Sequence, residues 1–398
     1  MSETFAIKDG VYWVGSKDPN LRVFDIIMDT KWGTTYNSYL ILDEKNVLID
    51  GVKGYCTREL IENISQYIDP AKLDYIVVNH NEPDHSGAID DILRLAPNAK
   101  VVTNSRSQMF LKEILNRDIN FQIVKDGEEL SLGKKTLKFI DAPFLHWPDT
   151  MFTYLKEDKI LFSCDAFGAH YCDVRMYDDG AGHHLHEFMF YFDVIMGPFK
   201  PKVLEAMKKV RTLDLEMIAP SHGPILRSDP WKYVDLYEKL SAPAVRCSSN
   251  FKALVCFVSA YGYTKMLADA IADEIRATDG FEVEIVDATE VDKASILAKI
   301  EESQYVFFGS PTINQNLLEP IAEIITAICP IKNKGKIVAS FGSYGWSGEA
   351  IKMMDDMLGA HKLRVVQSGY STRFRPSPEA LDEVKDFART VMTTSCGL

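Results

Sequence analysis

The sequence predicts an α/β protein of two domains, a β-rich domain over residues 1–245 and a doubly wound parallel sheet over residues 250–398. The chain has 398 residues, of which 46% are hydrophobic and 25% charged, a composition and length that favour two globular domains. The pattern changes after Leu240, where the small and polar stretch 241–249 (SAPAVRCSS) has the composition of a linker. Beyond this linker, strands and helices alternate regularly, as they do in a parallel sheet.

Short apolar runs separated by charged turns predict mostly strands in the first domain. The turns at Asp43–Asn46 and Lys156–Lys159 indicate hairpins of a mixed sheet. Helices are expected after Gly87, Ser105 and Pro201, the last two with a capping or first-turn proline signature. Strands are expected over Ser38–Leu42, Val47–Asp50, Leu73–Asn79, Lys100–Thr103, Thr136–Asp141, Phe152–Leu155 and Lys159–Ser163.

The second domain shows a strand–helix alternation over its whole length, which predicts ligand binding at the carboxyl ends of the strands. Its expected strands are Lys252–Val258, Glu282–Asp287, Tyr305–Gly309, Lys336–Phe341 and Arg364–Gly369. Its expected helices are Thr264–Ala277, Ala294–Glu301, Glu319–Ile328, Glu349–Leu358 and one that begins at Pro378.

Net charge narrows the class of binding partner, and cysteine usage indicates the redox environment of the protein. A net charge of −13 and a pI of about 5.2 make nucleic acid and anionic membranes unsuitable partners. Met1–Gly10 has no apolar core, so no signal peptide is expected, and no apolar run is long enough to span a membrane. The seven cysteines contain no C-x-x-C pair, which indicates reduced thiols and a cytoplasmic location rather than a disulfide framework, a zinc ribbon or a rubredoxin-type iron site.

One short segment contains four potential metal ligands within six residues. The segment Asn79–Gly87 (NHNEPDHSG) lies on a turn at the end of an expected strand, where His80, Glu82, Asp84 and His85 can converge on one point. His80 and Glu82 are two residues apart, whereas Asp84 and His85 are adjacent. The turn can therefore present two pairs of ligands to two metals.

Three more candidates follow strands further along the chain. His146 stands in LHWPD, Asp165 in SCDAFG and His222 in APSHGP. Taken singly, such a histidine is more often a hydrogen-bonded structural residue, and such an aspartate more often forms a turn or a cap. Together with the first four they make seven donors, which is enough for two metals if one carboxylate bridges them.

The order H-x-E-x-D-H, followed by separate His, Asp and His residues, resembles the metallo-β-lactamase superfamily. Zinc hydrolases of that superfamily usually carry histidine where Glu82 stands, and an additional carboxylate favours iron over zinc. With Glu82 in place, the pattern is most similar to the flavodiiron proteins, whose first domain is an αββα sandwich. The resemblance implies that one iron is ligated by His80, Glu82 and His146, the other by Asp84, His85 and His222, with Asp165 bridging both.

Several neighbouring residues have less certain roles. Trp147 would wall the metal site, although an ordinary core aromatic is an equal alternative, and His170 is a candidate to act beside the ligands. The loop with His183, His184 and His186 matches no ligand of the family and is expected to be structural.

Three loops of the second domain indicate a flavin site. They are Ser259–Thr264, Gly309–Asn316 and Phe341–Gly348. The first opens a helix, whose N-terminal N–H groups and dipole suit a phosphate. It resembles the phosphate loop of flavodoxins, and the other two loops lie at the same sheet edge, where small residues admit the flavin ring and Tyr344 and Trp346 cover it. The loops lack G-x-G-x-x-G, which disfavours a dinucleotide and favours FMN. The expected FMN-binding residues are Ser259, Ala260, Tyr261, Gly262, Tyr263, Thr264, Ser310, Pro311, Thr312, Ile313, Asn314, Gln315, Ser343, Tyr344, Gly345, Trp346, Ser347 and Gly348.

The family resemblance covers the whole chain and implies a division of labour. FMN accepts electrons and passes them to two non-haem irons, which reduce dioxygen to water or nitric oxide to nitrous oxide. Dioxygen needs four electrons, one from each iron and two from reduced FMN, whereas coupling two nitric oxide molecules needs two. The resemblance also implies a head-to-tail homodimer, or a dimer of dimers, and a separate electron donor such as rubredoxin or a reduced deazaflavin.

Some questions stay open at this point. Many relatives carry a histidine after the phenylalanine that corresponds to Phe24, but here Asp25 follows it, so the preference between dioxygen and nitric oxide is open, with dioxygen slightly favoured. The first domain could instead be a zinc hydrolase with an accessory flavodoxin domain, or the chain a pure electron carrier with a degenerate metal domain. Glu82 and the attached flavin domain oppose the hydrolase, and the complete set of seven donors opposes the electron carrier.

Overall fold

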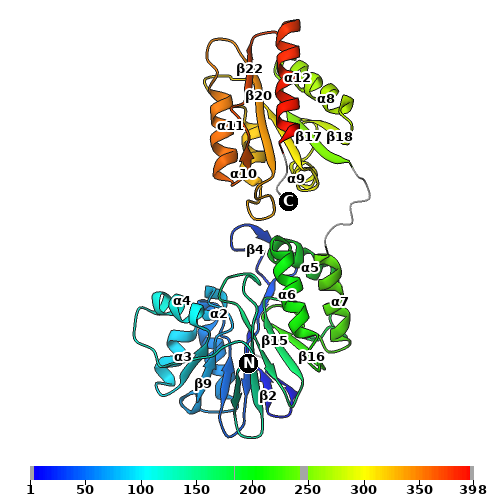
Figure 1. Cartoon of the computed structure of the whole chain (residues 1–398). Helices are drawn as coiled ribbons and strands as arrows, with labels where there is room; N and C mark the ends of the chain where they lie inside the picture. Colours follow the sequence, from blue (N-terminus) through cyan, green and yellow to red (C-terminus); the bar gives the residue numbers. More distant parts are fainter. Residues whose placement is uncertain (1–3, 183, 243–249, 395–398) are drawn as a thin grey trace. The chain divides into compact units, whose positions relative to one another are not determined.

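The structure, a computed structural model, describes residues 4–182, 184–242 and 250–394. The chain divides into two compact units, Met1–Pro243 and Ala244–Leu398 (Figure 1). All but the first two residues of the expected linker 241–249 lie outside the described residues, as does His183.

Two sheets lie face to face in the first unit. One is a seven-stranded sheet in the order β1-β2-β7-β8-β9-β10-β11, and the other is a five-stranded sheet in the order β12-β13-β14-β15-β16. The first comprises β1 (Phe5–Lys8), β2 (Val11–Trp13), β7 (Tyr39–Ile41), β8 (Val47–Ile49), β9 (Tyr75–Val77), β10 (Lys100–Thr103) and β11 (Phe121–Ile123). The second comprises β12 (Glu129–Ser131), β13 (Thr136–Asp141), β14 (Met151–Leu155), β15 (Ile160–Cys164) and β16 (Met217–Pro220).

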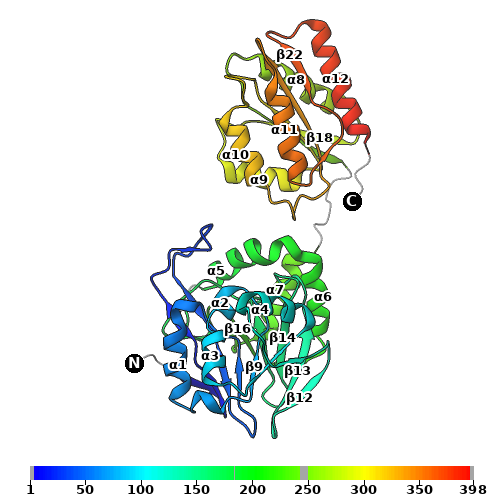
Figure 2. The ribbon, with the colours of Figure 1, turned by 90° about the vertical axis from the view of Figure 1, so that its left-hand side faces the viewer.

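Helices cover the outer face of each sheet. Figures 1 and 2 show α1 (Thr57–Ser65), α3 (Ile89–Leu95) and α4 (Ser105–Leu115) on the side of the first sheet, and α6 (Lys200–Val210) and α7 (Pro230–Ser241) on the side of the second. An apolar core that includes Trp13, Tyr39, Phe139 and Phe162 fills the space between the sheets. Further apolar clusters lie beneath the helices on each side. The first unit is therefore the predicted αββα sandwich.

Two short antiparallel strand pairs and several short helical segments complete the first unit. β3 (Ser16–Asp18) pairs with β6 (Thr34–Tyr36), and the hairpin of β4 (Val23–Phe24) and β5 (Met28–Asp29) lies between them in the chain. The helical segments include α2 (Pro83–Ser86) and α5 (His184–Tyr191), the latter continued by a π-helical stretch, Phe192–Met196.

The second unit is a parallel sheet in the order β18-β17-β19-β20-β21, the strand order of a flavodoxin-like fold. Its strands are β17 (Phe251–Phe257), β18 (Phe281–Asp287), β19 (Tyr305–Gly309), β20 (Ile337–Tyr344), β21 (Arg364–Val365) and β22 (Tyr370–Arg373). One face is covered by α8 (Tyr263–Ala277) and α12 (Pro378–Thr393), the other by α9 (Lys293–Glu302), α10 (Glu319–Ala327) and α11 (Glu349–Ala360) (Figure 1). This is the predicted doubly wound sheet.

The prediction of a single strand over Arg364–Gly369 is wrong. Two short strands, β21 and β22, pair in succession with β20, and Gly369 lies just before the second. A Cβ atom at Gly369 would lie 1.9 Å from Ser340 Oγ, so the chain approaches β20 there as only glycine can. No described helix has the length and apolarity needed to cross a membrane.

A buried asparagine ties the sheet core to the loop after β16. The Asn37 side-chain amide donates to the carbonyl oxygens of Pro220 and Gly223 at 2.8 and 2.9 Å, and its oxygen accepts from Trp13 Nε1 at 2.9 Å. Gly223 has a φ of +76°, and a Cβ there would lie 2.5 Å from the Ala169 carbonyl oxygen. These contacts fix the loop that bears His222.

We predict that Asn37→Ala destabilises the first unit. Trp13 Nε1 and the Gly223 carbonyl would lose the Asn37 side chain as a partner, while the Pro220 carbonyl would keep the Tyr39 hydroxyl, so the free energy of unfolding should fall by about 2 kcal/mol. Calorimetry of the full chain would measure the loss, with Asn120→Ala as the control because Asn120 is exposed. Equal stability of the two variants would contradict this role.

Candidate functional site

The seven predicted metal ligands come together in the first unit. All of them lie at or just after the carboxyl ends of strands: the group His80 to His85 after β9, His146 after β13, Asp165 after β15 and His222 after β16. The strands belong to both sheets, so the two halves of the sandwich contribute to one site. Glu82 and His146 are partly exposed, with side-chain exposures of 15% and 18%, and the other five side chains are buried.

The two carboxylate oxygens of Asp165 face different sets of side chains. Asp165 Oδ2 lies 3.6 Å from His80 Nε2 and 3.7 Å from His146 Nε2, and Glu82 Oε2 is 3.3 and 2.9 Å from the same two nitrogens. Asp165 Oδ1 instead faces a second set, at 3.1 Å from His85 Nε2 and 3.5 Å from His222 Nε2. The family resemblance implied the two sets, but which oxygen of Asp165 faces each set could not be inferred from the sequence.

The second set is completed by Asp84. Its Oδ2 lies 3.0 Å from His222 Nε2 and its Oδ1 lies 3.5 Å from His85 Nε2. Within the described residues, Asp84 Oδ1 and His85 Nε2 are buried and have no hydrogen-bond partner. Buried polar atoms without a partner are rare, and a cation between them would satisfy both.

Donor atoms converge closely enough for two cations. One group, His80, Glu82, His85 and Asp165, and another, Asp84, His85 and His222, each have ligand atoms within 4.8 Å of one another. By this measure His85 belongs to both groups. Its contact with Asp165 is to Oδ1, the oxygen that also faces His222, so His85 lies with the Asp84 group. Imidazole and carboxylate donors suit iron.

The charges of the site also fit cations. Burial alone would lower the pKa of His222, but the carboxylates of Asp165 and Asp84 raise it to about 10. Burial alone would raise the pKa of Asp165, but His85 and His222 hold it well below its usual range. The buried carboxylates require positive charge close to them. Protonated histidines can supply this charge, and bound metal ions would replace those protons.

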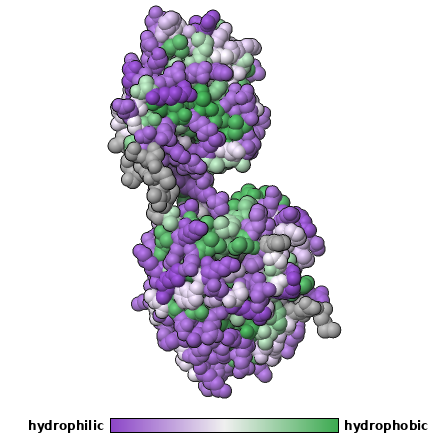
Figure 3. Space-filling view, turned by 90° about the vertical axis from the view of Figure 1, so that its right-hand side faces the viewer, coloured by the Kyte–Doolittle hydropathy of each residue, from purple (hydrophilic) through white to green (hydrophobic). Residues whose placement is uncertain are grey.

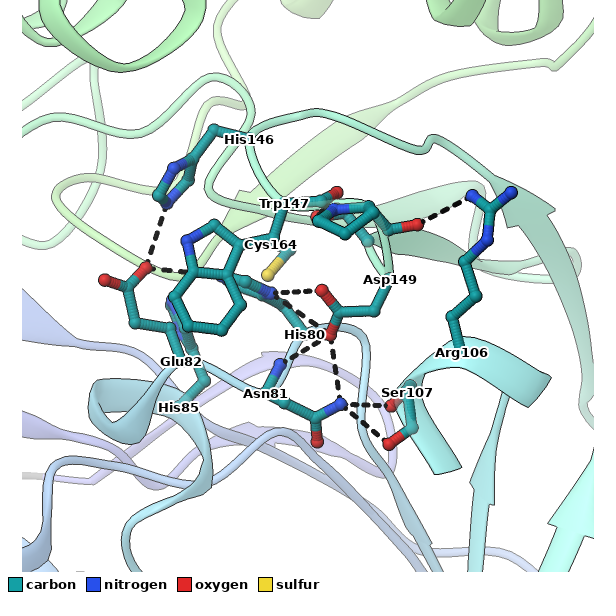
Figure 4. A network of polar contacts seen from close by, with 12 residues as sticks. His80, Asn81, Glu82, His85, Arg106, Ser107, His146, Trp147, Asp149 and Cys164 are labelled. Carbon is teal, nitrogen blue, oxygen red and sulfur yellow. Dashed lines mark hydrogen bonds and ion pairs between the residues drawn. The ribbon is translucent and has the colours of Figure 1, made fainter. Parts of the chain in front are cut away.

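Hydrogen bonds around the cluster orient its imidazoles. Figure 4 shows His80 Nδ1 facing Asp149, with contacts of 3.3 and 3.4 Å, while Asp149 also accepts from the backbone and side chain of Asn81 at 3.0 Å. His222 Nδ1 lies 2.6 Å from the Thr35 carbonyl oxygen and therefore carries the proton. Both histidines are left with Nε2 directed at the cluster, as a metal ligand requires.

The second unit has a cavity of about 270 Å³ at the carboxyl ends of its strands. Residues from all three predicted loops line it: Ser259, Ala260, Tyr261, Tyr263, Pro311, Thr312, Ile313, Asn314, Ser343, Tyr344, Gly345 and Trp346. The first loop leads into α8, whose first N–H groups are free of helix partners and suit a phosphate. The aromatic and small residues of the other loops suit a planar ring, so the cavity fits FMN.

Six predicted residues of these loops do not line the cavity, namely Gly262, Thr264, Ser310, Gln315, Ser347 and Gly348. Thr264 connects two of the loops instead, with its Oγ1 2.9 Å from Ser343 Oγ. Phe374 does line the cavity, although sequence reasoning missed it. It follows β22, a strand whose separate course the sequence did not predict.

Comparisons with known proteins agree with this architecture over the whole chain. The family model described as "ODP family beta lactamase" matches residues 34–223, and the flavodoxin model matches residues 255–387. The flavo-diiron protein FprA2 of Clostridium acetobutylicum is 40% identical, with 97% of this chain and 99% of that protein covered. This chain belongs to the flavodiiron protein family.

Two further relatives are similar at full length. A protein named nitric oxide reductase from Moorella thermoacetica is 36% identical, with 98% of both chains covered. The structure of rubredoxin oxygen:oxidoreductase from Desulfovibrio gigas is similar with a TM-score of 0.71 and 30% identity, and 98% of both chains is covered.

In this flavodiiron chain, Trp147 and His170 both lie beside the ligands. The Trp147 ring is 4.9 Å from the His80 ring and 6.3 Å from that of His146 (Figure 4). The His170 ring lies 5.1 Å from His222 and 4.3 Å from Phe24. Burial lowers the pKa of His170 well below its usual range, so this imidazole is neutral.

Tyr191 is a residue of the site that the sequence did not reveal. Its hydroxyl group donates to Asp165 Oδ1 at 2.9 Å, and its ring is 4.9 Å from that of His170. It ends an apolar helix that resembles an ordinary core segment, so no sequence signal marked it. Asp149 was also missed, although it follows His146 by three residues.

The other candidates lie differently. Asp25 stands in the turn of the β4–β5 hairpin, with Oδ1 3.8 Å from Lys53 Nζ, and burial and the Glu82 carboxylate raise its pKa. His184 Nε2 lies 3.0 Å from the Tyr233 hydroxyl group, and His186 pairs with Glu187 at the surface. Neither histidine belongs to the metal cluster, in agreement with the structural role expected for them.

We predict that Asp149→Ala weakens iron binding. The variant removes the acceptor that orients His80, and loss of such a partner costs about 10- to 100-fold in metal affinity. Anaerobic titration with Fe²⁺ against a competing chelator would measure the change. Asp118→Ala, at an exposed site, is the matched control. Iron affinity equal to that of the control would exclude this orienting role.

Proposed function

We propose that the protein is a flavodiiron oxidoreductase that reduces dioxygen to water, nitric oxide to nitrous oxide, or both. The observation that carries the proposal is the division of seven donors into two sets by the two oxygens of Asp165. Two adjacent metals suit the binding and multi-electron reduction of a small diatomic molecule. The names of the relatives from Moorella thermoacetica and Desulfovibrio gigas support the same two substrates.

In this proposal the two sets hold two irons. His80, Glu82 and His146 would hold one, Asp84, His85 and His222 would hold the other, and Asp165 would be shared by both. When bound, the irons together with FMN supply the electrons, four for dioxygen and two for a pair of nitric oxide molecules. The loops that begin at Ser259, Ser310 and Ser343 hold FMN.

The residues beside the ligands control access and proton position. Trp147, whose ring lies 4.9 Å from that of His80, walls that side of the site and keeps water away from it. Thr34 Oγ1 lies 2.9 Å from His170 Nδ1 and 3.3 Å from the Thr35 carbonyl oxygen, to which its hydroxyl donates. His170 therefore carries its proton on Nδ1, which leaves an unprotonated Nε2 that is buried and unpartnered within the described residues.

Electrons reach FMN from a separate donor, for which rubredoxin or a reduced deazaflavin are the candidates. The name of the Desulfovibrio gigas relative supports rubredoxin. The five described cysteines Cys56, Cys164, Cys172, Cys256 and Cys329 are free thiols, which suits the reducing cytoplasm that we propose as the location.

A homodimer supplies the path from FMN to iron. Figure 3 shows apolar side chains gathered in patches on both units. In the first unit Ile26 and Ile27, 93% and 85% exposed, form the tip of the β4–β5 hairpin, whose Phe24 packs on His170. In the second unit Tyr261 and Trp346 are exposed at the cavity rim. Exposed apolar groups at both redox sites favour head-to-tail pairing of two copies, alone or within a dimer of dimers.

Metal and flavin analysis tests the proposed activity. Protein purified without added metal should contain about two irons and one FMN per chain. The enzyme, reduced under anaerobic conditions, should then consume added dioxygen or nitric oxide. Asp165→Asn should lose most iron and turnover but retain FMN, because it removes the shared charge from the metal site alone. Zinc in place of iron, with little flavin, would overturn the proposal and favour a hydrolase.

The proposed homodimer leads to a separate prediction for the β4–β5 hairpin. Replacing both Ile26 and Ile27 by Asp should weaken self-association at least tenfold and slow electron transfer from FMN to iron, because charge would be buried in an apolar contact. Analytical ultracentrifugation and rapid-mixing spectroscopy would measure the two effects. Ile331→Asp is the control, since Ile331 is 54% exposed at the opposite, amino end of the second unit's sheet. An unaltered dimer would reject the hairpin as the contact.

A further inference from the structure

The strand β22 brings a fourth segment to the flavin cavity. β20 pairs with β21 near its start, through Ile337 and Val338, and with β22 near its end, from Phe341 to Tyr344. Asp355 fixes the displacement of β22 from β21 along β20. Its carboxylate accepts from Ser340 Oγ at 2.6 Å and from the Gly369 N–H at 3.0 Å. β22 therefore ends beside the third flavin loop.

Phe374 follows β22 and is held against that loop. Its N–H donates to the Tyr344 carbonyl oxygen at 2.7 Å, and the neighbouring Arg373 Nε donates to the Gly345 carbonyl oxygen at 2.9 Å. The Phe374 ring packs so closely that a Cβ on Gly345 would lie 3.1 Å from it. These three contacts join residues 373–374 and the third loop into one wall of the cavity.

Two features of Phe374 are unfavourable in the chain by itself. Its φ of +57° lies in the left-handed region, which bulky residues rarely adopt, and 56% of the residue is exposed. Strained backbone is typically retained where it serves a ligand, and an exposed aromatic at a cavity edge is a surface for a ligand to cover. Both features are accounted for if a bound ring shields Phe374.

We propose that Phe374 is a fourth, unassigned contact of the flavin site and packs on the conjugated ring of FMN, with Arg373 as the positioning residue. This inference rests on the proposed function, since it requires FMN in the cavity. A phenyl ring gives the apolar, polarisable surface that a planar ring system prefers. It also excludes water from the ring and places π-electron density near it, which disfavours the negative charge of the fully reduced flavin.

FMN binding to the full-length apoprotein is the test. Titration followed by quenching of flavin fluorescence should show about tenfold weaker binding for Phe374→Ala, the loss expected for one aromatic ring contact. Phe374→Tyr, which keeps the ring, should bind as the wild type does. Spectroelectrochemistry of the loaded alanine variant should show a higher midpoint potential for formation of the reduced flavin.

Ile331→Ala is the matched control for the truncation of Phe374. Ile331 is another exposed apolar residue of the same unit, so its loss should leave FMN affinity and potential unchanged. If Phe374→Ala keeps the FMN affinity and midpoint potential of the wild type, the inference is overturned but the proposed function is not. A change in self-association alone would show that Phe374 is a protein-contact residue instead. Absence of FMN binding by the wild-type chain would overturn the proposed function itself. Circular dichroism would verify that each variant is folded.

Discussion

The first unit depends on the placement of one carboxylate, that of Asp165, between two sets of buried donors. Its Oδ2 faces His80 and its Oδ1 faces His85 and His222, so a single residue defines two adjacent cation positions. A buried carboxylate is unfavourable without positive charge nearby. Burial opposes the ionised form of Asp165, but His85 and His222 hold its pKa well below its usual range. The rest of the unit can be understood as the scaffold that brings these groups together.

That scaffold uses strand ends from both sheets and a layer of hydrogen bonds behind them. Asp149 holds His80, the Thr35 carbonyl holds His222, and Tyr191 holds Asp165 itself. Each of these contacts directs a donor atom toward the cluster and away from the alternative partners that a free side chain would find. Trp147 and His170 lie beside this layer, with their rings next to those of His80 and His222.

The fold and the convergence of the seven donors were predictable because both leave local signals in the sequence. Strands such as Lys100–Thr103, Thr136–Asp141 and Tyr305–Gly309 have the predicted bounds, since short apolar runs end at charged or glycine-containing turns. Tyr191 and Phe374 escaped prediction because their roles depend on long-range packing, one within an apolar helix and the other after a strand displaced at Gly369. The family resemblance implied that Asp165 is shared, but which of its oxygens faces which set depends on the three-dimensional geometry.

Anomalous diffraction at the iron edge from crystals of the iron-loaded protein tests the central claim most directly. Our account predicts two iron peaks in the first unit, one bound by each oxygen of Asp165, with His80, Glu82 and His146 around the first and Asp84, His85 and His222 around the second. A single iron peak, or two irons of which only one contacts Asp165, would contradict it.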